Sequence, residues 1–209
     1  MKLTIVEIRE IVNMLEDKME EKKDYLIKLD SKLGDGDLGL TLSKAFKAAS
    51  ESIEDFEDDD IGKALLKMAM SINNAASSTL GTLLSSGIME AGKAVKGKEE
   101  ITKYDIVDIT DAVIKGIKKR GKAKKGDKTI LDCFIPASRA LKEKIKEDKS
   151  LLESLEFACE AAEKGVEETK DMVSQHGRAR YYGEDSKGHK DPGAVAGLII
   201  IKTIKNYME

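Results

Sequence analysis

Apolar residues recur at every third or fourth position along most of the chain, and this spacing restricts the fold more than any other feature. The first series consists of Ile5, Ile8, Val12, Leu15 and Met19. Such residues share one face of an α-helix and would bury that face against other helices. No stretch alternates apolar and polar residues convincingly, as a half-buried strand would. The sequence therefore predicts an all-α protein.

The periodicity predicts eight helices, with expected ranges 3–27, 38–52, 61–72, 79–95, 104–120, 130–147, 151–173 and 193–207. Capping-box patterns at Thr102–Asp105 and Ser150–Glu153 mark two of the starts. An acidic run that ends at Asp60 precedes a third start, where negative charge is favourable. Pro192 suits the opening turn of the last helix, whereas Pro136 should kink its helix or delay its start.

Composition narrows the functional classes. The chain has 209 residues, 41% apolar and 36% charged, without a linker rich in Pro, Gly or Ser, so we expect one globular domain over 1–209. The formal charge of −3 and the absence of Trp argue against a nucleic-acid partner. The longest apolar run, Ala194–Ile201, is too short to span a membrane.

Two further features predict a cytoplasmic location. Cys133 and Cys159 lack Cys-x-x-Cys spacing, which favours reduced, packed thiols. The N-terminus acquires acidic residues at once, with Glu7 and Glu10, and so does not resemble a signal peptide.

Four polar, glycine-containing segments interrupt the helices: "LGDGDLG" (33–39), "NNAASSTLGT" (73–82), "RGKAKKGDKT" (120–129) and "HGRARYYGEDSKGHKDPG" (176–193). Each lies immediately before an expected helix. The backbone N–H groups at such helix starts can hold phosphate. In an up-and-down helical bundle these segments would share one end.

Three aspartates crowd the first of these segments and its approach: Asp30, Asp35 and Asp37. Oxygen ligands of this kind suit Mg²⁺, which commonly binds carboxylates together with phosphate oxygens. Alternatively, Asp37 could cap the next helix and Asp35 could form an Asx turn. The position of Asp30 near a helix C-terminus, where a carboxylate is disfavoured, favours the metal site.

The other segments offer phosphate-binding groups, each with a plainer alternative. Ser77, Ser78 and Thr79 supply hydroxyls and helix-start amides, but one could be an ordinary N-cap. The basic segment 120–129 could attract a polyanion or simply be solvated. Arg178 could clamp a phosphate, whereas His176 and His189 are more typical of structural hydrogen bonding.

Taken together, "LDSKLGDGDLG", "RGKAKKGDKT" and "GRARYYGEDSKGHKDPGAV" resemble the nucleotide-binding L subunit of dihydroxyacetone kinase in order and spacing. The resemblance implies an eight-helix antiparallel up-and-down barrel with ADP or ATP bound by loops at one end through two Mg²⁺ ions. It implies metal ligation by Asp30, Asp35 and Asp37. It implies nucleotide contacts by Leu38, Gly39, Leu40, Thr41, Ser77, Ser78, Gly121, Ile130, Arg178, Asp191, Pro192 and Gly193.

In this reading Arg178 is the catalytic residue that supplies positive charge during transfer, and the amides at Gly39–Thr41 and Ser77–Thr79 bind phosphate oxygens. In the family, a separate K subunit holds dihydroxyacetone on a histidine, and a phosphocarrier M subunit can recharge the nucleotide. The chain could also form a homodimer.

Two departures from the family pattern leave alternatives open. Leu38 stands where the family usually has His, and "NAASSTLG" lacks the paired glycines of the usual small-residue loop. We therefore expect a phosphotransferase subunit that acts on dihydroxyacetone or a related short ketose. A nucleotide-bound regulatory partner and a Mg-dependent hydrolase of a phosphorylated metabolite are the two alternatives.

Overall fold

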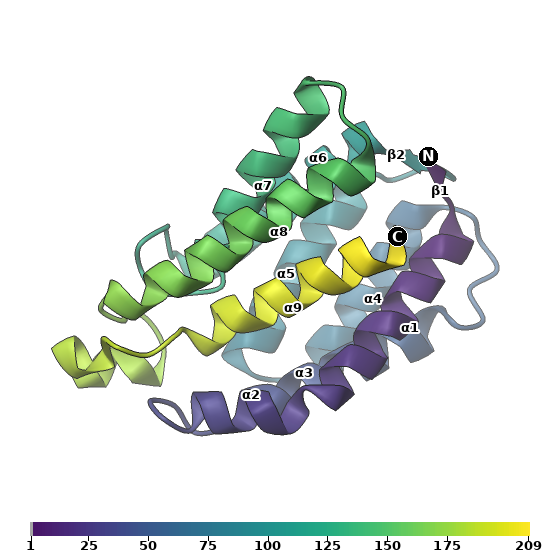
Figure 1. Cartoon of the computed structure of the whole chain (residues 1–209). Helices are drawn as coiled ribbons and strands as arrows, with labels where there is room; N and C mark the ends of the chain where they lie inside the picture. Colours follow the sequence, from purple (N-terminus) through teal and green to yellow (C-terminus); the bar gives the residue numbers. More distant parts are fainter. Residues whose placement is uncertain (1) are drawn as a thin grey trace. The chain divides into compact units, whose positions relative to one another are not determined.

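The structure is a computed structural model that describes residues 2–209. Within this range its secondary structure is helical apart from one pair of strands of two residues each (Figure 1). The α-helices are α1 (Ile5–Glu21), α2 (Lys23–Asp30), α3 (Leu38–Ile53), α4 (Ile61–Ala75), α5 (Thr79–Ala94), α6 (Lys103–Gly121), α7 (Leu131–Lys146), α8 (Leu151–Glu168) and α9 (Pro192–Tyr207). The remaining elements are the strands β1 (Lys2–Leu3) and β2 (Ile101–Thr102) and the 3₁₀-helices η1 (Thr169–Asp171) and η2 (Arg178–Ser186).

The prediction of an all-α protein is confirmed, but the first predicted helix is two helices. The break lies at Lys22, where no buried residue occurs between Met19 and Leu26 to hold one straight helix against the core. The helix predicted over 151–173 ends at Glu168 and continues as η1. The helix predicted over 61–72 continues to Ala75, into the segment that we expected to be irregular.

Three other expectations need correction. β1 and β2 pair antiparallel, although no strand was predicted, because two residues are too few to produce an alternating pattern. Part of the predicted loop 176–193 is helical, as η2, with a kink at Gly183. Helix α7 begins at Leu131 and contains Pro136, so the delayed start, which was one of the two alternatives for this proline, is wrong, while the kink stays a prediction.

The predicted helix starts are largely confirmed. Ser150 and Glu153 form a reciprocal capping box. The Asp60 carboxylate accepts a hydrogen bond from the Lys63 N–H and caps α4. At Thr102–Asp105 the Asp105 carboxylate accepts from both the backbone N–H and the hydroxyl of Thr102, which is one half of the predicted box.

The described chain divides into two compact units, and the prediction of a single domain over 1–209 stays a prediction. Unit 1 contains the residues up to Glu20 together with Thr41–Gly121, and unit 2 contains Glu21–Leu40 and Lys122–Glu209. The chain passes between the units three times, after Glu20, after Leu40 within α3, and after Gly121.

Unit 1 packs its helices through apolar stripes and small residues. The predicted stripe of α1 is buried, from Ile5 to Met19. The guanidinium of Arg9 on α1 donates to the C=O groups of Ile53 and Phe56, which ties α1 to the end of α3. On α6, a Cβ atom at Gly116 would lie 2.4 Å from the C=O oxygen of Ser86, so α5 and α6 approach closely there.

Unit 2 is built on α7, α8 and α9, which run beside one another (Figure 1). A Cβ atom at Gly165 of α8 would lie only 2.1 Å from the C=O oxygen of Asp132 on α7. Pro136 has no N–H to donate to that carbonyl, which is why the neighbouring helix can approach it. The thiols of Cys133 and Cys159 are free and buried, as predicted.

No helix within residues 2–209 combines the length and the apolar character needed to cross a membrane.

Candidate metal centre

The three predicted aspartate ligands come together in unit 2. Asp30 is the last residue of α2, and Asp35 and Asp37 lie in the turn before α3. One carboxylate oxygen from each lies within 4.8 Å of the others. Gly36 has a φ of +71°, which lets the turn present both of its flanking aspartates to the same point. A Cβ atom at Gly34 would lie 2.3 Å from the Asp30 Oδ1 atom, so a larger residue there would displace the Asp30 carboxylate.

The electrostatics of this cluster favour a cation. Burial raises the pKa of Asp30, and the carboxylates of Asp35 and Asp37 raise it further, while the backbone N–H groups of Leu38 and Gly36 oppose the rise. Burial and the neighbouring Asp35 also raise the pKa of Asp37, against the attraction of Arg178. The cluster therefore carries more negative charge than its surroundings stabilise. Oxygen ligands at this spacing fit a hard divalent cation such as Mg²⁺.

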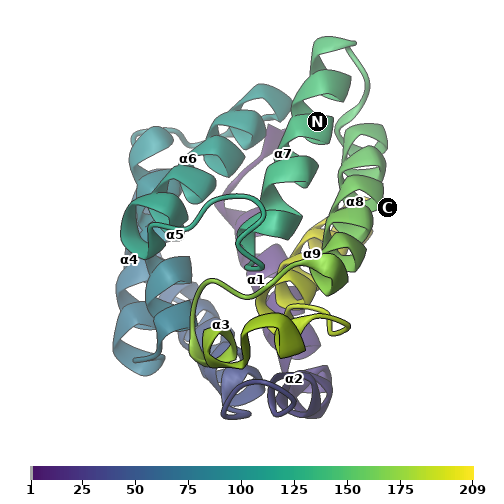
Figure 2. The ribbon, with the colours of Figure 1, turned by 90° about the vertical axis from the view of Figure 1, so that its left-hand side faces the viewer.

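Arg178 lies beside this cluster. Its Nε atom is 2.7 Å from the Asp35 Oδ2 atom, although 70% of the arginine side chain is exposed. Arg178 is the first residue of η2, and Figure 2 shows the segment of η2 next to the turn after α2. An open pocket of about 360 Å³ adjoins the contact, lined by Leu33, Gly34, Arg178, Tyr181 and Tyr182.

Asp191 caps α9 and belongs to the same electrostatic environment. Its carboxylate accepts a hydrogen bond of 2.7 Å from the Ala194 N–H. Burial raises the pKa of Asp191 to about 7, with further increases from Asp132 and Asp30, against the Ala194 N–H and Lys128. The backbone N–H of Asp191 donates to the hydroxyl of Thr169, which fixes the start of the helix.

The other predicted nucleotide residues of unit 2 lie at helix starts. Pro192 opens α9, and a Cβ atom at Gly193 would lie 3.5 Å from the backbone N of Ile130, so these segments are neighbours. Ile130 itself is buried. A Cβ atom at Gly39 would lie 2.2 Å from the C=O oxygen of Lys23, so the first turn of α3 packs closely on α2. The side chain of Leu40 is exposed.

Five predicted residues belong to unit 1: Thr41, Ser77, Ser78, Thr79 and Gly121. The Ser78 hydroxyl accepts from the Gly81 N–H at 3.1 Å, so it is the N-cap of α5, which was the alternative to phosphate binding. Ser77 and Thr79 are exposed beside it. Thr41 is buried in α3, and Gly121 ends α6. Nucleotide contacts by all five stay predictions.

Sequence reasoning missed a set of buried polar residues in unit 2. The fully buried Asp132 carboxylate accepts from the N–H groups of Gly126 and Thr129, at 2.5 and 2.8 Å. The Thr-x-x-Asp spacing from Thr129 to Asp132 could have predicted this, since it is a capping pattern. The burial of Lys128 and Thr169 had no such signal, because lysine and threonine are usually exposed.

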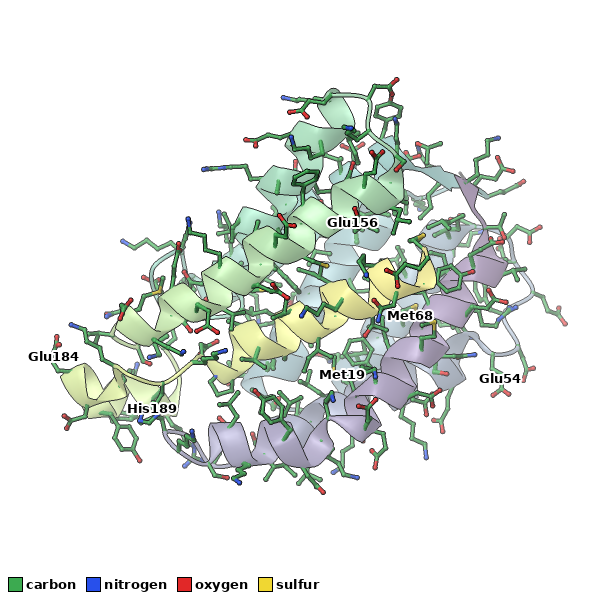
Figure 3. All side chains as sticks on the ribbon, in the orientation of Figure 1. Met19, Glu54, Met68, Glu156, Glu184 and His189 are labelled. Atoms are coloured by element: carbon green, nitrogen blue, oxygen red, sulfur yellow. The ribbon has the colours of Figure 1, made fainter. Side chains whose placement is uncertain are left out.

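His176 makes a hydrogen bond between two segments, as expected for a structural histidine. The His176 Nε2 atom is 3.1 Å from the Asp127 Oδ2 atom, which joins segments 120–129 and 176–193. Figure 3 shows His189 and Glu184 on the connection between α8 and α9, at the end of unit 2 that carries η2.

Comparison with known proteins identifies related sequences over most of the chain. The model of the DAK2 domain matches residues 32–206. The ADP-binding subunit DhaL of the PEP-dependent dihydroxyacetone kinase of Escherichia coli (strain K12) is 30% identical over 198 residues, which cover 93% of this chain and 94% of that protein. The corresponding subunit of dihydroxyacetone kinase 2 from Listeria innocua is 30% identical over 188 residues, which cover 89% of this chain and 87% of that protein.

The fold also matches a solved structure. The dihydroxyacetone kinase from C. freundii, in complex with AMP-PNP and Mg²⁺, superposes with a TM-score of 0.74 at 23% identity. The match covers 95% of this chain and 33% of that one, so the chain spans about a third of the solved protein.

Proposed function

Because this chain belongs to the DAK2 domain family, as an ADP-binding subunit of the dihydroxyacetone kinase type, we propose that it transfers the γ-phosphoryl group of a Mg-bound nucleotide to dihydroxyacetone or a related short ketose. The observation that carries this proposal is the convergence of Asp30, Asp35 and Asp37 on one point beside Arg178. Phosphoryl transfer depends mainly on positioning and on neutralising charge, and these four side chains are suited to both tasks.

We assign the metal ligands to the three aspartates and expect two Mg²⁺ ions. Mg²⁺ would neutralise charge on the phosphate oxygens and so stabilise charge that moves toward the leaving group. Burial first, and then the neighbouring carboxylates, raise the pKa values of Asp30 and Asp37, and this supports the assignment because a bound cation would stabilise the charged form of each group. The relative from C. freundii was crystallised with AMP-PNP and Mg²⁺, which supports the same ligand class here.

The remaining proposed contacts divide by chemistry. The helix-start amides of Leu38–Thr41 and Ser77–Thr79 would hold phosphate oxygens. Gly121, Ile130 and Asp191–Gly193 would contact the nucleoside or close the site around it. Arg178 would act as the catalytic residue, because its exposed guanidinium already lies at the edge of the aspartate cluster and can move to a phosphate.

We further propose that the acceptor is held by a separate K subunit, and that a phosphocarrier M subunit recharges bound ADP. The two bacterial relatives support this reading, since each is described as a subunit of a PEP-dependent kinase. A cytoplasmic location and a possible homodimer stay predictions.

The residue at position 38, Leu38, is compatible with a second function. An apolar side chain stands where the family usually has His, so the chain could bind nucleotide without transferring it, as a regulatory partner. A Mg-dependent hydrolase of a phosphorylated metabolite is the other alternative. An assay with a matched K subunit, dihydroxyacetone and ATP separates the three. Triose phosphate that depends on both chains supports the kinase, binding to a partner without turnover supports the regulator, and unaided phosphate release supports the hydrolase.

Native mass spectrometry of the purified chain tests the site itself. We expect ADP and two Mg²⁺ ions to be retained, and we expect Asp35→Ala to lose both together. Asp24→Ala is the matched control, because it removes an exposed carboxylate from α2, away from the cluster. Equal nucleotide retention by Asp35→Ala and Asp24→Ala would show that the cluster does not hold the nucleotide.

A further inference from the structure

Lys128 is buried in unit 2 although lysine is among the residues that are least often buried. Only 3% of its surface is exposed, and its backbone has a φ of +61°, in the left-handed region. The Lys128 ammonium donates to the C=O of Ser186 at 2.5 Å and to the C=O of Met172 at 3.3 Å. This lysine therefore binds backbone from two separate points of the chain.

Those two carbonyls mark the ends of segment 172–186, which contains Arg178 and η2. The same ends are joined directly, since the Ser174 N–H donates to the Ser186 hydroxyl at 2.9 Å. A closed segment of this length with its ends together is a compact loop whose position depends on what holds the ends. The Lys128 ammonium is one of the groups that hold these two ends together.

The residue before Lys128 contacts the same segment. The Asp127 C=O accepts from the Gln175 N–H at 3.1 Å, and the Asp127 carboxylate lies 3.1 Å from the His176 Nε2 atom. Residues 127 and 128 thus contact the segment at Met172, at 175–176 and at Ser186. These contacts flank Arg178 on both sides.

Core packing alone does not explain a lysine at this position. Burial lowers the pKa of Lys128, and the carboxylates of Asp191 and Asp171 partly oppose that shift. An apolar side chain would avoid the burial of an ammonium group, but it would leave the carbonyls of Met172 and Ser186 without this donor. The hydrogen bonds that the Lys128 ammonium donates to these two carbonyls therefore account for a lysine at this position.

We propose that Lys128 is a positioning residue, which joins the two ends of segment 172–186 and thereby keeps Arg178 beside the aspartate cluster. This inference rests on the proposed function, since it assigns Lys128 an effect on Mg-nucleotide binding through Arg178. It concerns a residue that touches neither the aspartates nor the pocket beside them.

The test compares Lys128→Met, which keeps the length of the side chain and removes the donors, with Lys128→Arg, which keeps a charged donor. Both variants retain the left-handed backbone strain, because neither introduces glycine. We expect Lys128→Met to weaken Mg·ADP binding about tenfold, as the loss of one well-placed charged contact would. Lys128→Arg should recover part of that loss, and Lys187→Met, at an exposed lysine that follows η2, should change nothing.

A double-mutant cycle with Arg178→Ala separates positioning from general destabilisation. If Lys128 acts through Arg178, Lys128→Met should have almost no further effect on Mg·ADP affinity once Arg178 is alanine. Equal losses in both backgrounds would overturn the proposal. Unchanged Mg·ADP affinity in Lys128→Met, measured well below its Tm, would overturn it as well.

Limited trypsin digestion gives a readout that does not require nucleotide. Cleavage after Arg178 and Arg180 should be at least severalfold faster in Lys128→Met than in the wild type, while cleavage in the α7–α8 turn at Lys146–Lys149 keeps its rate. Equal cleavage at 178–180 would overturn the proposal.

If the wild type binds no nucleotide, the proposed function fails, and this digestion still decides whether Lys128 holds the segment. Should Lys128→Met fail to fold, Lys128→Gln carries the same comparison.

Discussion

Asp37→Asn should make the metal-free protein more stable and the Mg·ADP-bound protein less stable. The Asp37 carboxylate lies near two other carboxylates, with ligand atoms within 4.8 Å of one another. At that distance each repulsion is about 1 kcal/mol at the dielectric constant of water, which we use because residue 37 is exposed overall, although partial burial of its carboxylate raises the pKa. Arg178 and salt offset part of the sum, so we expect a gain of about 1 kcal/mol without ligand.

The ligand-bound state reverses this order. A ligand at 100 times its Kd stabilises the folded wild type by about 2.7 kcal/mol. Asn supplies a neutral oxygen in place of a carboxylate, and the variant should lose most of that stabilisation. Asparagine is as good an N-cap as aspartate, so any capping of α3 is preserved and the metal effect is isolated.

Thermal unfolding with and without Mg·ADP measures both effects. For a chain of this size we expect the metal-free Tm of Asp37→Asn to rise by about 2–4 °C. Asp24→Asn removes the same charge from the first turn of α2, where it favours the helix, so this control should not raise the metal-free Tm and should leave the Mg·ADP-induced shift unchanged. A fall in the metal-free Tm of Asp37→Asn, or an equal Mg·ADP shift in variant and wild type, would refute the reasoning.

Three further predictions concern unit 2. The pKa of Asp191 in the folded protein is about 7, above the ordinary 3.8, so the folded state binds this proton more tightly than the unfolded state does. Tm should therefore fall as pH rises from about 4 to about 7. Asp191→Asn, which can still cap α9, should reduce the dependence of Tm on pH. Gly165→Ala should lower the free energy of unfolding, measured by urea titration, by about 1–3 kcal/mol. The reason is that the alanine Cβ would lie 2.1 Å from the C=O oxygen of Asp132 and would push α8 away from α7. An unchanged urea midpoint would mean that the two helices can separate without cost. Ser150→Ala should cost about 1 kcal/mol through loss of the α8 capping box, and Ser150→Asp should restore most of it in the same titration.

The helices and the aspartate turn could be predicted from local sequence. Apolar spacing places the buried stripe of α1, and capping residues such as Ser150 and Asp60 mark helix starts, because both signals act within a few residues along the chain. Asp35 and Asp37 are only two residues apart, and Asp30 ends the preceding helix. Their convergence therefore needed little more than the turn at Gly36.

The sequence by itself determined the all-α class, the acidic turn and the family to which the chain belongs. Tertiary structure alone decided which distant groups meet: Arg178 with Asp35, Asp191 with the charge of Asp132, and Lys128 with the carbonyls of Met172 and Ser186. The physical reason is range. Helix propensity and capping depend on near neighbours, whereas burial, desolvation and ion pairing depend on segments that only the folded chain brings together.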